Sequence, residues 1–498
     1  MTDIPRNHTM MQFFEWHLAN DGEHWNRLKE MAPEIRSHGI TSLWIPPASK
    51  AISQDDNGYG LYDGYDLGEF DQKGTTRTKF GTKKELLDAI DTCRDLGIRV
   101  YADVVMNHKA GADDTEQFEV VEVDPDDRTS VISEPFEIEG WTYFDFPGRE
   151  GKYSDFVWHH HHFNGTDYDH SEGKDGIFRI LGEDKDWNEQ VDDEFGNYDY
   201  LMFANIDYNH PEAREETVKW GTWFAEETRV DGYRLDAIKH INHDFIADFL
   251  WKMRETFGDD FYFVGEFWNP DVDAKEAFLE EVHYSIDLFD VGLHYSFHEA
   301  SQTGEDFDMR TIFDNSLVQR HPVNAVTFVD NHDSQPGESL ESWVEDWFKQ
   351  HAYALILLRE DGYPCVFFGD YYGINGNYEM PGKKEQINPL LDARHHAAYG
   401  AQQDYFDHPN TIGWVRLGDE DVPGSGCAVV MTNGEEGWKE MYVGELHSGE
   451  TWIDVTGNCG SSVEIGEDGK ASFFAPDGSV SVYIPEPTWQ DIQDKDNG

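Results

Sequence analysis

Short apolar runs alternate with amphipathic runs along most of the chain, and this alternation limits the folds that it can form. Three strand-like runs, Met10–Trp16, Thr41–Ile45 and Arg99–Val105, are separated by helical runs at Trp25–Ser37 and Lys83–Arg94. Five more strand-like runs follow after residue 210: Val230–Leu235, Phe261–Glu266, Ser285–Phe289, Ala325–Val329 and Pro364–Phe368. Alternating strands and helices are typical of a parallel sheet covered by helices, and eight such strands predict an α/β fold of the (β/α)8 TIM barrel type.

The alternation stops between about residues 106 and 209. This stretch is rich in Asp, Gly, Asn and His, has short β-prone runs such as Gly176–Leu181, and is too long for a plain loop. It predicts an irregular, β-rich inserted domain after strand 3. Beyond Gly400, short strands such as Gly426–Thr432 and Val480–Ile484 with Gly-rich turns indicate a C-terminal β-sandwich. The predicted domains are residues 1–105 and 210–399 for the barrel, 106–209 for the insert, 400–486 for the sandwich and 487–498 for a frayed acidic tail.

The charge balance excludes several classes of partner. The chain has 100 Asp and Glu against 38 Lys and Arg, a formal net charge of −62. Such a surface repels nucleic acid and anionic membranes, so neither is expected as a partner. At ~1 M salt the Debye length falls to about 3 Å, which screens most of the self-repulsion. Because the acids run along the whole chain and are not gathered in one tail, the sequence predicts a halophilic protein.

The cysteines and the N-terminus bear on the compartment. The four cysteines (Cys93, Cys365, Cys427 and Cys459) are scattered and form no CxxC pair, which predicts free thiols and no zinc site. No basic region followed by an apolar run is visible at the N-terminus, and no segment approaches ~18 uninterrupted apolar residues. A cytoplasmic, monomeric protein is expected, with a secreted mature chain as the alternative.

Four segments end in polar residues, as barrel strands do where they deliver chemistry at their carboxyl ends. They are Asp103–His108, Gly232–His240, Gly265–Trp268 and Phe328–Asp333. Three of them offer a carboxylate suited to cleavage of a glycosidic bond, and the first offers a metal ligand. Retaining glycosidases need two carboxyl groups about 5–5.5 Å apart, one as nucleophile and one as acid/base.

Each carboxylate has neighbours that suit a particular role. Arg234 and Asp236 are two apart on a predicted strand and share a face, and a guanidinium keeps a carboxylate ionised, as a nucleophile requires. Glu266 follows the apolar run Phe261–Val264, which raises a carboxyl pKa and suits a proton donor. Asp333 is placed to hold sugar hydroxyls and to stabilise positive charge. A single Asp in so acidic a chain is most often surface decoration, but three at separate strand ends indicate a site.

In order and spacing these segments resemble the α-amylase superfamily of glycoside hydrolases, in particular its bacterial liquefying and intracellular members. The resemblance runs from about Thr9 to about Ile484. It includes four further motifs: Gly58-Tyr59-Gly60-Leu61-Tyr62-Asp63, Phe80-Gly81-Thr82, Tyr198-Asp199-Tyr200-Leu201-Met202 and Tyr405-Phe406-Asp407-His408. It implies endo-acting, retaining hydrolysis of α-1,4-glucosidic bonds in starch, glycogen and maltooligosaccharides. A 4-α-glucanotransferase or a maltooligosaccharide-forming amylase on the same site are alternatives. A non-catalytic binding homologue is disfavoured because all three acids are kept.

The resemblance also implies roles for individual residues. Asp236 is the expected nucleophile, Glu266 the acid/base and Asp333 the third acid. Seven residues are expected to bind sugar: Tyr59 by stacking, His108, Arg234 and His332 on the same sugar, and Lys239, His240 and Trp268 on the leaving-group side.

One structural Ca²⁺ is implied between the insert and the barrel. The matching oxygen ligands are Asn107, Asp199, Asn205 and the backbone carbonyl of His240, a donor set that Ca²⁺ accepts. Further cations are not expected, because amides replace the acids that they would need, at Asn164, Asn209, Asn410 and Asn433. The run His159–His162 is expected to fill space in the insert, since imidazoles bind a metal only when their geometry converges.

Overall fold

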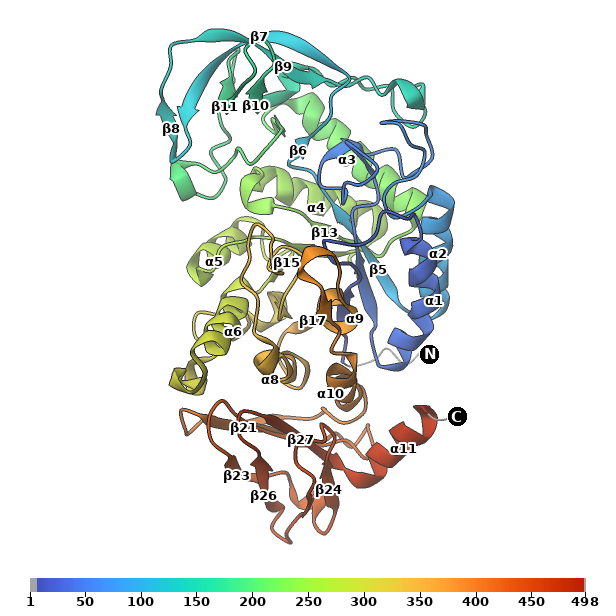
Figure 1. The fold of residues 1–498 in the computed structure, drawn as a ribbon, viewed down its shortest axis with the longest axis vertical. Coiled ribbons are helices and arrows are strands. Elements are labelled where there is room, and N and C mark those ends of the chain that lie inside the picture. The colour runs from blue at the N-terminus through green and yellow to red at the C-terminus, as the bar shows by residue number, and fades with distance from the viewer. Residues whose placement is uncertain (1–6, 497–498) are drawn as a thin grey trace.

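A computed structural model describes residues 7–496 and contains a closed, eight-stranded parallel barrel (Figure 1). Its strands, in spatial order, are β1 (Met10–Gln12), β2 (Ser42–Ile45), β5 (Arg99–Val104), β13 (Gly232–Leu235), β14 (Tyr262–Gly265), β15 (Asp287–Phe289), β16 (Ala325–Phe328) and β17 (Tyr363–Phe367). Pairing of β17 with β1 closes the barrel. All eight predicted strands are present, so the predicted barrel is confirmed.

Helices cover the outside of the barrel. The longer ones are α1 (His24–Ser37), α2 (Lys83–Asp95), α3 (Pro211–Thr228), α4 (His243–Phe257), α5 (Val272–Glu281), α6 (Val291–Thr303), α8 (Asp346–Leu357) and α10 (Lys384–His396), with the shorter α7 (Leu317–Arg320) and α9 (Phe368–Tyr372). Their local sequence explains their ends. For example, Thr82 and Glu85 form a capping box that begins α2, whose Leu86 and Ile90 are buried at helical spacing.

The insert after β5 is an antiparallel sheet at one end of the molecule, at the top of Figure 1. Its strands are β6 (His108–Lys109), β7 (Asp114–Asp124), β8 (Asp127–Val131), β9 (Phe136–Tyr143), β10 (Phe163–Asp169), β11 (Lys174–Ile180) and β12 (Ala204–Ile206). Because β6 follows the barrel strand β5 and β12 leads into α3, both ends of the insert lie above the carboxyl end of the barrel.

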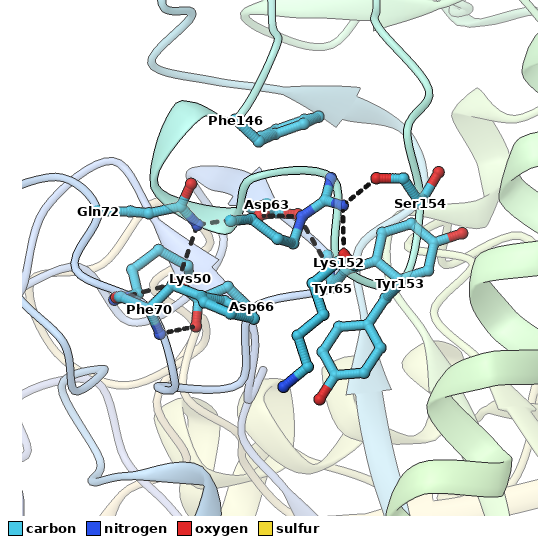
Figure 2. A network of polar contacts seen from close by, with 12 residues as sticks. Lys50, Asp63, Tyr65, Asp66, Phe70, Gln72, Phe146, Lys152, Tyr153 and Ser154 are labelled. Carbon is cyan, nitrogen blue, oxygen red and sulfur yellow. Dashed lines mark hydrogen bonds and ion pairs between the residues drawn. The ribbon is translucent and has the colours of Figure 1, made fainter.

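A buried polar network ties the insert to a hairpin of the barrel formed by β3 (Lys50–Ala51) and β4 (Leu61–Asp63) (Figure 2). Arg149 of the insert donates through Nε to Oδ2 of Asp63 over 2.9 Å, and both side chains are almost fully buried. The Gln72 amide donates to the same oxygen over 2.9 Å and to Asp66 over 3.0 Å. A network this buried fixes the hairpin, and hence the loop between its strands, relative to the insert.

The C-terminal part is a β-rich domain of two sheets, in agreement with the predicted sandwich. One sheet has the order β20 (Gln402–Tyr405), β21 (Thr411–Arg416), β22 (Cys427–Thr432), β27 (Val480–Pro485), β24 (Thr451–Asp454) and β25 (Ser462–Glu464), and the other pairs β23 (Gly437–Tyr442) with β26 (Lys470–Ala475). Side chains from both sheets, such as Val430 and Phe473, are fully buried in a shared core. Two short strands that follow α9, β18 (Gly373–Ile374) and β19 (Met380–Pro381), pair with each other.

The expectation of a frayed acidic tail over 487–498 is wrong for the residues that the structure describes. Residues Glu486–Asp496 form helix α11, seen near the C-terminus in Figure 1. Its Ile492 is buried and its Trp489 packs against the core. The two apolar residues lie three apart, on one face of a helix. The prediction of a frayed tail rested on the acidic composition of this segment and did not use this spacing.

The four cysteines are free and buried, which confirms the prediction of free thiols. In such positions a thiol packs as a small apolar group. Over residues 7–496, the structure holds no helix of the length and apolar character needed to span a bilayer.

Candidate active site

Three carboxyl groups meet at the carboxyl end of the barrel. Asp236 directly follows β13, Glu266 directly follows β14, and Asp333 lies in the loop after β16. All three line one cleft with a volume of about 360 Å³. Parallel strands of a barrel deliver their carboxyl ends to the same face, so residues far apart in the sequence converge there.

One guanidinium links the acids. Nη1 of Arg234 lies 2.6 Å from Oδ1 of Asp236, and Nη2 lies 2.9 Å from Oε2 of Glu266. Nη1 also donates to both oxygens of Asp103 on the neighbouring strand β5, at 3.0 and 3.1 Å. The strand register explains this, since Arg234 pairs with Asp103 on one side. A fully buried arginine thus holds two carboxyl groups of the cleft in fixed positions from below.

The electrostatics differ from the sequence argument in one respect. Burial raises the pKa of Asp236 to about 6 although the Arg234 charge opposes the rise, whereas the sequence argument considered only the guanidinium. At neutral pH Asp236 is still mostly ionised. Burial also raises the pKa of Glu266, against Arg234 and with the Asp236 charge, and it raises the pKa of Asp333 well above its ordinary value. Carboxyl groups with raised pKa values in a cleft are suited to acid/base work.

The backbone after Asp236 is strained. Ala237 has a φ of 49°, in the left-handed region that favours glycine. In this conformation its N–H donates to Oε2 of Glu266 over 3.0 Å. Strain of this kind persists when surrounding structure holds it, and it clusters at functional sites. Here the strained turn lets the backbone of Ala237, the residue after Asp236, hold the Glu266 carboxylate.

An aromatic wall forms one side of the cleft. The rings of Tyr59 and His332 are stacked with centroids 5.2 Å apart and an interplanar angle of 6°. Trp16 stacks on His332 at 5.8 Å and on Tyr59 at 5.8 Å. The Tyr59 hydroxyl donates to Oδ2 of Asp103 over 2.8 Å. A rigid aromatic surface beside carboxylates is suited to a sugar ring, which has an apolar face and polar edges.

Hydrogen bonds fix the tautomer of His332. The Gln12 amide nitrogen donates to Nδ1 over 3.0 Å, so the proton of the neutral ring is on Nε2. That nitrogen lies 3.2 Å from Oδ2 of Asp333, and both residues line the cleft. His332 is therefore a donor next to the third acid.

Three other predicted sugar-binding residues that border the cleft, Lys239, His240 and His108, are held by backbone carbonyl oxygens. Nζ of Lys239 lies 2.8 Å from Oε2 of Glu194 and 3.1 Å from the carbonyl oxygen of Trp268. His240 donates through Nδ1 to the carbonyl oxygen of Tyr198 over 2.7 Å, and burial lowers its pKa to about 3. His108 contacts the carbonyl oxygen of Tyr59 through Nε2 over 2.8 Å. Neutral imidazoles of fixed orientation result.

The structure brings the predicted sugar-binding residues to the border of the cleft, with the exception of Arg234. Six of the seven sugar-binding candidates border the cleft with the three acids: Tyr59, His108, Lys239, His240, Trp268 and His332. Arg234 lies beneath it, fully buried.

Other residues of the site were missed from the sequence. Trp16 and Tyr198 line the cleft, and Trp44 donates through Nε1 to Oδ2 of Asp103 over 2.9 Å. Asp103 opens one of the four polar strand ends, which was an available signal. Its contact with Arg234 depends on strand register, which a single sequence does not reveal.

The predicted calcium ligands Asp199 and Asn205 are both buried. Asp199 accepts hydrogen bonds from the side chains of Asn188 and Asn164, and has its pKa raised to about 7 by burial. Among the described residues no cationic side chain forms an ion pair with it. Oδ1 of Asn205 is buried and has no hydrogen-bond partner within residues 7–496. A buried carboxylate without a counter-charge beside an unpartnered amide oxygen fits a Ca²⁺ site.

The remaining two predicted ligands lie near these residues. The N–H of Ile206, next to Asn205, donates to the carbonyl oxygen of Asn107 over 3.0 Å. The His240 ring contacts the residue before Asp199. The ligand set therefore comes from the end of β5, the insert and the turn after β13.

A second oxygen cluster at the base of the insert does not fit a further cation. The ammonium of Lys185 lies 2.6 Å from Oδ2 of Asp207, 2.6 Å from the carbonyl oxygen of His161 and 2.9 Å from that of Phe163. The lysine side chain is 7% exposed. A tethered positive charge therefore already contacts these oxygens.

A third cluster, between the barrel and the C-terminal domain, is filled by amides. The side-chain nitrogen of Asn433 donates to the carbonyl oxygens of Gly304 and Phe307, both over 2.8 Å. That of Asn410 donates to the carbonyl oxygen of Glu305 over 2.6 Å. N–H donors point at oxygens that a cation would need, so this joint does not fit a cation either.

Residues 25–404 match the family model "Alpha amylase, catalytic domain", and residues 428–484 match "Alpha-amylase C-terminal". The chain is 52% identical over 480 residues to an α-amylase of Bacillus licheniformis, covering 96% of this chain and 93% of that protein. It is 50% identical over 479 residues to a glucan 1,4-α-maltohexaosidase of Bacillus sp. (strain 707), covering 96% and 92%. It is 44% identical over 495 residues to a cytoplasmic α-amylase of Escherichia coli (strain K12), covering 97% and 99%.

Proposed function

The chain belongs to the α-amylase family of glycoside hydrolases, and from that premise we propose how it cleaves α-glucans. It is an endo-acting α-amylase that hydrolyses α-1,4-glucosidic bonds in starch, glycogen and maltooligosaccharides with retention. The observation that carries the proposal is the single buried guanidinium of Arg234, which contacts Asp236 and Glu266 at the ends of adjacent strands. Retaining cleavage needs two carboxyl groups that are close together and flank the scissile bond.

The first step uses both carboxyl groups. The Asp236 carboxylate attacks the anomeric carbon and forms an ester bond to the sugar, while Glu266 gives its proton to the glycosidic oxygen and the bond between that oxygen and the anomeric carbon breaks. The freed chain end leaves as an alcohol. A raised pKa lets Glu266 carry this proton near neutral pH.

The second step reverses the roles. The Glu266 carboxylate takes a proton from water, the water oxygen bonds to the anomeric carbon, and the ester bond to Asp236 breaks. Two inversions at one carbon give net retention. The regenerated acid and carboxylate are ready for the next bond.

The surrounding side chains position the sugar. Tyr59 supplies a stacking face, and His332 and Asp333 hydrogen-bond the hydroxyls of the same sugar. Asp333 also faces the positive charge that develops on the ring. Arg234 keeps the two reacting carboxyl groups in place, and it acts as a positioning residue beneath the cleft.

Ca²⁺ binding is proposed at one site only. Asn107, Asp199, Asn205 and the carbonyl of His240 would hold one Ca²⁺, and the buried, uncompensated Asp199 carboxylate supports this. When bound, the ion supplies positive charge that holds the insert above the barrel. It takes no part in bond cleavage.

Several broader features are proposed with it. The barrel comprises residues 1–105 and 210–399, the insert 106–209 and the C-terminal domain 400–486. The net charge of −62 supports adaptation to high salt. The free thiols and the similarity to a cytoplasmic α-amylase support a cytoplasmic location. The protein acts as a monomer on neutral glucans and has no nucleic-acid or membrane partner.

A second candidate is a maltooligosaccharide-forming amylase on the same site. The similarity to a glucan 1,4-α-maltohexaosidase favours this candidate, since half of the aligned residues are identical (50%) over most of both chains. A 4-α-glucanotransferase would share the first step and replace water by a sugar hydroxyl. The ratio of hydrolysis to transfer products from maltoheptaose separates these activities.

The test combines a product profile with variants. Asp236→Asn and Glu266→Gln should each lower kcat on soluble starch by at least ~1,000-fold, because each removes a group that acts in the transition state. Asp287→Asn is the matched control. Burial raises the pKa of Asp287 to about 6, but this residue begins β15 and so lies at the amino end of a barrel strand, away from the cleft at the carboxyl ends. Activity of Asp236→Asn or Glu266→Gln within tenfold of the parent would refute the proposal.

A further inference from the structure

A cluster of imidazoles and a carboxylate lies where the insert meets helix α3, away from the catalytic cleft. One ligand atom from each of His161, His162, His210 and Glu212 lies within 4.8 Å of the others. His161 and His162 belong to the short helical turn that precedes β10, whereas His210 caps α3 and Glu212 lies in its first turn. The cluster therefore joins two segments from different domains.

The hydrogen bonds of His162 decide its role. The backbone N–H of His159 donates to Nδ1 of His162 over 2.9 Å, so the proton of the neutral ring is on Nε2. That N–H points at Oε2 of Glu212 over 3.2 Å. His162 offers no lone pair to a metal and instead orients the carboxylate, as a residue behind a metal ligand does.

The other two imidazoles are free to bind. Nδ1 of His210 is buried and has no hydrogen-bond partner in the described part of the chain. The ring of His161 lies 5.5 Å from that of His210, and His161 is exposed, so it can turn towards it. A neutral imidazole is the form that binds a metal.

We propose that His161, His210 and Glu212 form a binding site for a divalent transition metal ion such as Zn²⁺, and that the ion staples the insert to the barrel. Two imidazoles and one carboxylate are a donor set that Zn²⁺ prefers and Ca²⁺ does not. Ligand atoms about 2.0–2.1 Å from a tetrahedral ion are about 3.3 Å apart, so the cluster closes around the ion by small side-chain movements. Water completes the coordination.

This site differs from the space-filling role expected for the run His159–His162. The four consecutive imidazoles are evident in the sequence, but their proximity to His210, which is distant in the chain, could not be predicted from it. Convergence from two segments supplies the geometry that a run alone lacks. The strongly negative net charge of the protein further favours cations at its surface.

The experiment titrates Zn²⁺ into the full-length, chelator-treated protein and follows binding by calorimetry. Molar KCl screens non-specific attraction to the acidic surface, and excess Ca²⁺ fills the proposed calcium site. Co²⁺ is titrated in parallel, because its visible absorption reports nitrogen ligands and a low coordination number. One Zn²⁺ per chain and a rise in melting temperature are expected.

Variants identify the ligands. His161→Ala and His210→Ala should each weaken Zn²⁺ binding by at least ~10-fold, as loss of even an outer partner does, and should remove the Co²⁺ absorption. His160→Ala is the matched control from the same run, since its ring stacks on Phe118 at 5.2 Å. Equal Zn²⁺ affinity in all three variants, or no saturable binding in molar KCl, would overturn the proposal. The starch assay is a separate readout, so failure here leaves the proposed hydrolase activity standing.

Discussion

Replacing Lys185 by methionine should loosen the base of the insert and leave the barrel intact. The Lys185 ammonium lies 2.6 Å from Oδ2 of Asp207, and the two side chains are 7% and 3% exposed. It also donates to the carbonyl oxygens of His161 and Phe163. Methionine fills a similar volume but supplies neither charge nor N–H. The Asp207 carboxylate is then buried without its counter-charge.

The magnitude follows from this burial. Removing one partner of a buried ion pair costs about 3–5 kcal/mol, because the other charge is left uncompensated. Entry of water reduces that cost, so the lower figure is used. Since 1.4 kcal/mol corresponds to a factor of ten, about 3 kcal/mol corresponds to a roughly 100-fold increase in local opening.

Amide hydrogen exchange measures such local opening. In Lys185→Met, the protected amides of β10 and β12 should exchange about 100-fold faster, while those of β13 in the barrel should be unchanged. Adding Asp207→Asn to Lys185→Met should restore much of the protection, because the uncompensated charge is removed. Lys174→Met is the control, since Lys174 pairs with Glu122 in the same sheet but is 48% exposed.

Two results would refute this reasoning. One is unchanged exchange of β10 and β12 in Lys185→Met. The other is equal acceleration in Lys174→Met, which would show that any lost lysine of the insert has the same effect. Either result would mean that the oxygen cluster around Lys185 does not depend on its ammonium.

Two further predictions concern solution conditions. The folded, metal-free protein holds the Asp199 proton up to about pH 7, whereas the ordinary value is 3.8. The folded state therefore binds more protons between these values, and this group makes stability fall as pH rises from about 4 to 7. Melting temperatures of EDTA-treated protein should show a steeper fall than those of Asp199→Asn, and added Ca²⁺ should remove the difference; identical slopes would count against the site. Stability should also rise steeply from millimolar to molar KCl or NaCl, and equal melting temperatures in both would show that the acidic surface is no salt adaptation.

The sequence was sufficient for the barrel because its strands are short, buried and β-prone. Runs such as Ala325–Val329 differ by only one residue from the observed β16. Polar residues at the ends of these runs also pointed to Asp236, Glu266 and Asp333, which lie together in one cleft because a barrel gathers its strand ends on one face. In these segments the local sequence pattern agrees with the overall fold, and this agreement allows both to be predicted from the sequence.

Contacts between segments that are distant in the chain could not be predicted from the sequence. The pairing of Arg234 with Asp103 depends on strand register, and the meeting of His161 with His210 depends on how the insert sits on α3. The pKa of Asp236 depends on burial, which overrides the guanidinium considered alone. Each of these is a property of the assembled fold and not of a local run.

The identity of the nucleophile tests the account most directly. In Glu266→Gln, a fluorinated maltosyl fluoride needs no acid to lose its fluoride, while removal of the base slows hydrolysis of the resulting ester. The glycosyl-enzyme should accumulate, and peptide mapping by mass spectrometry should find one fluoromaltosyl group on Asp236. A fluoromaltosyl group on Asp333, or release of the inverted product with no covalent adduct, would contradict the mechanism.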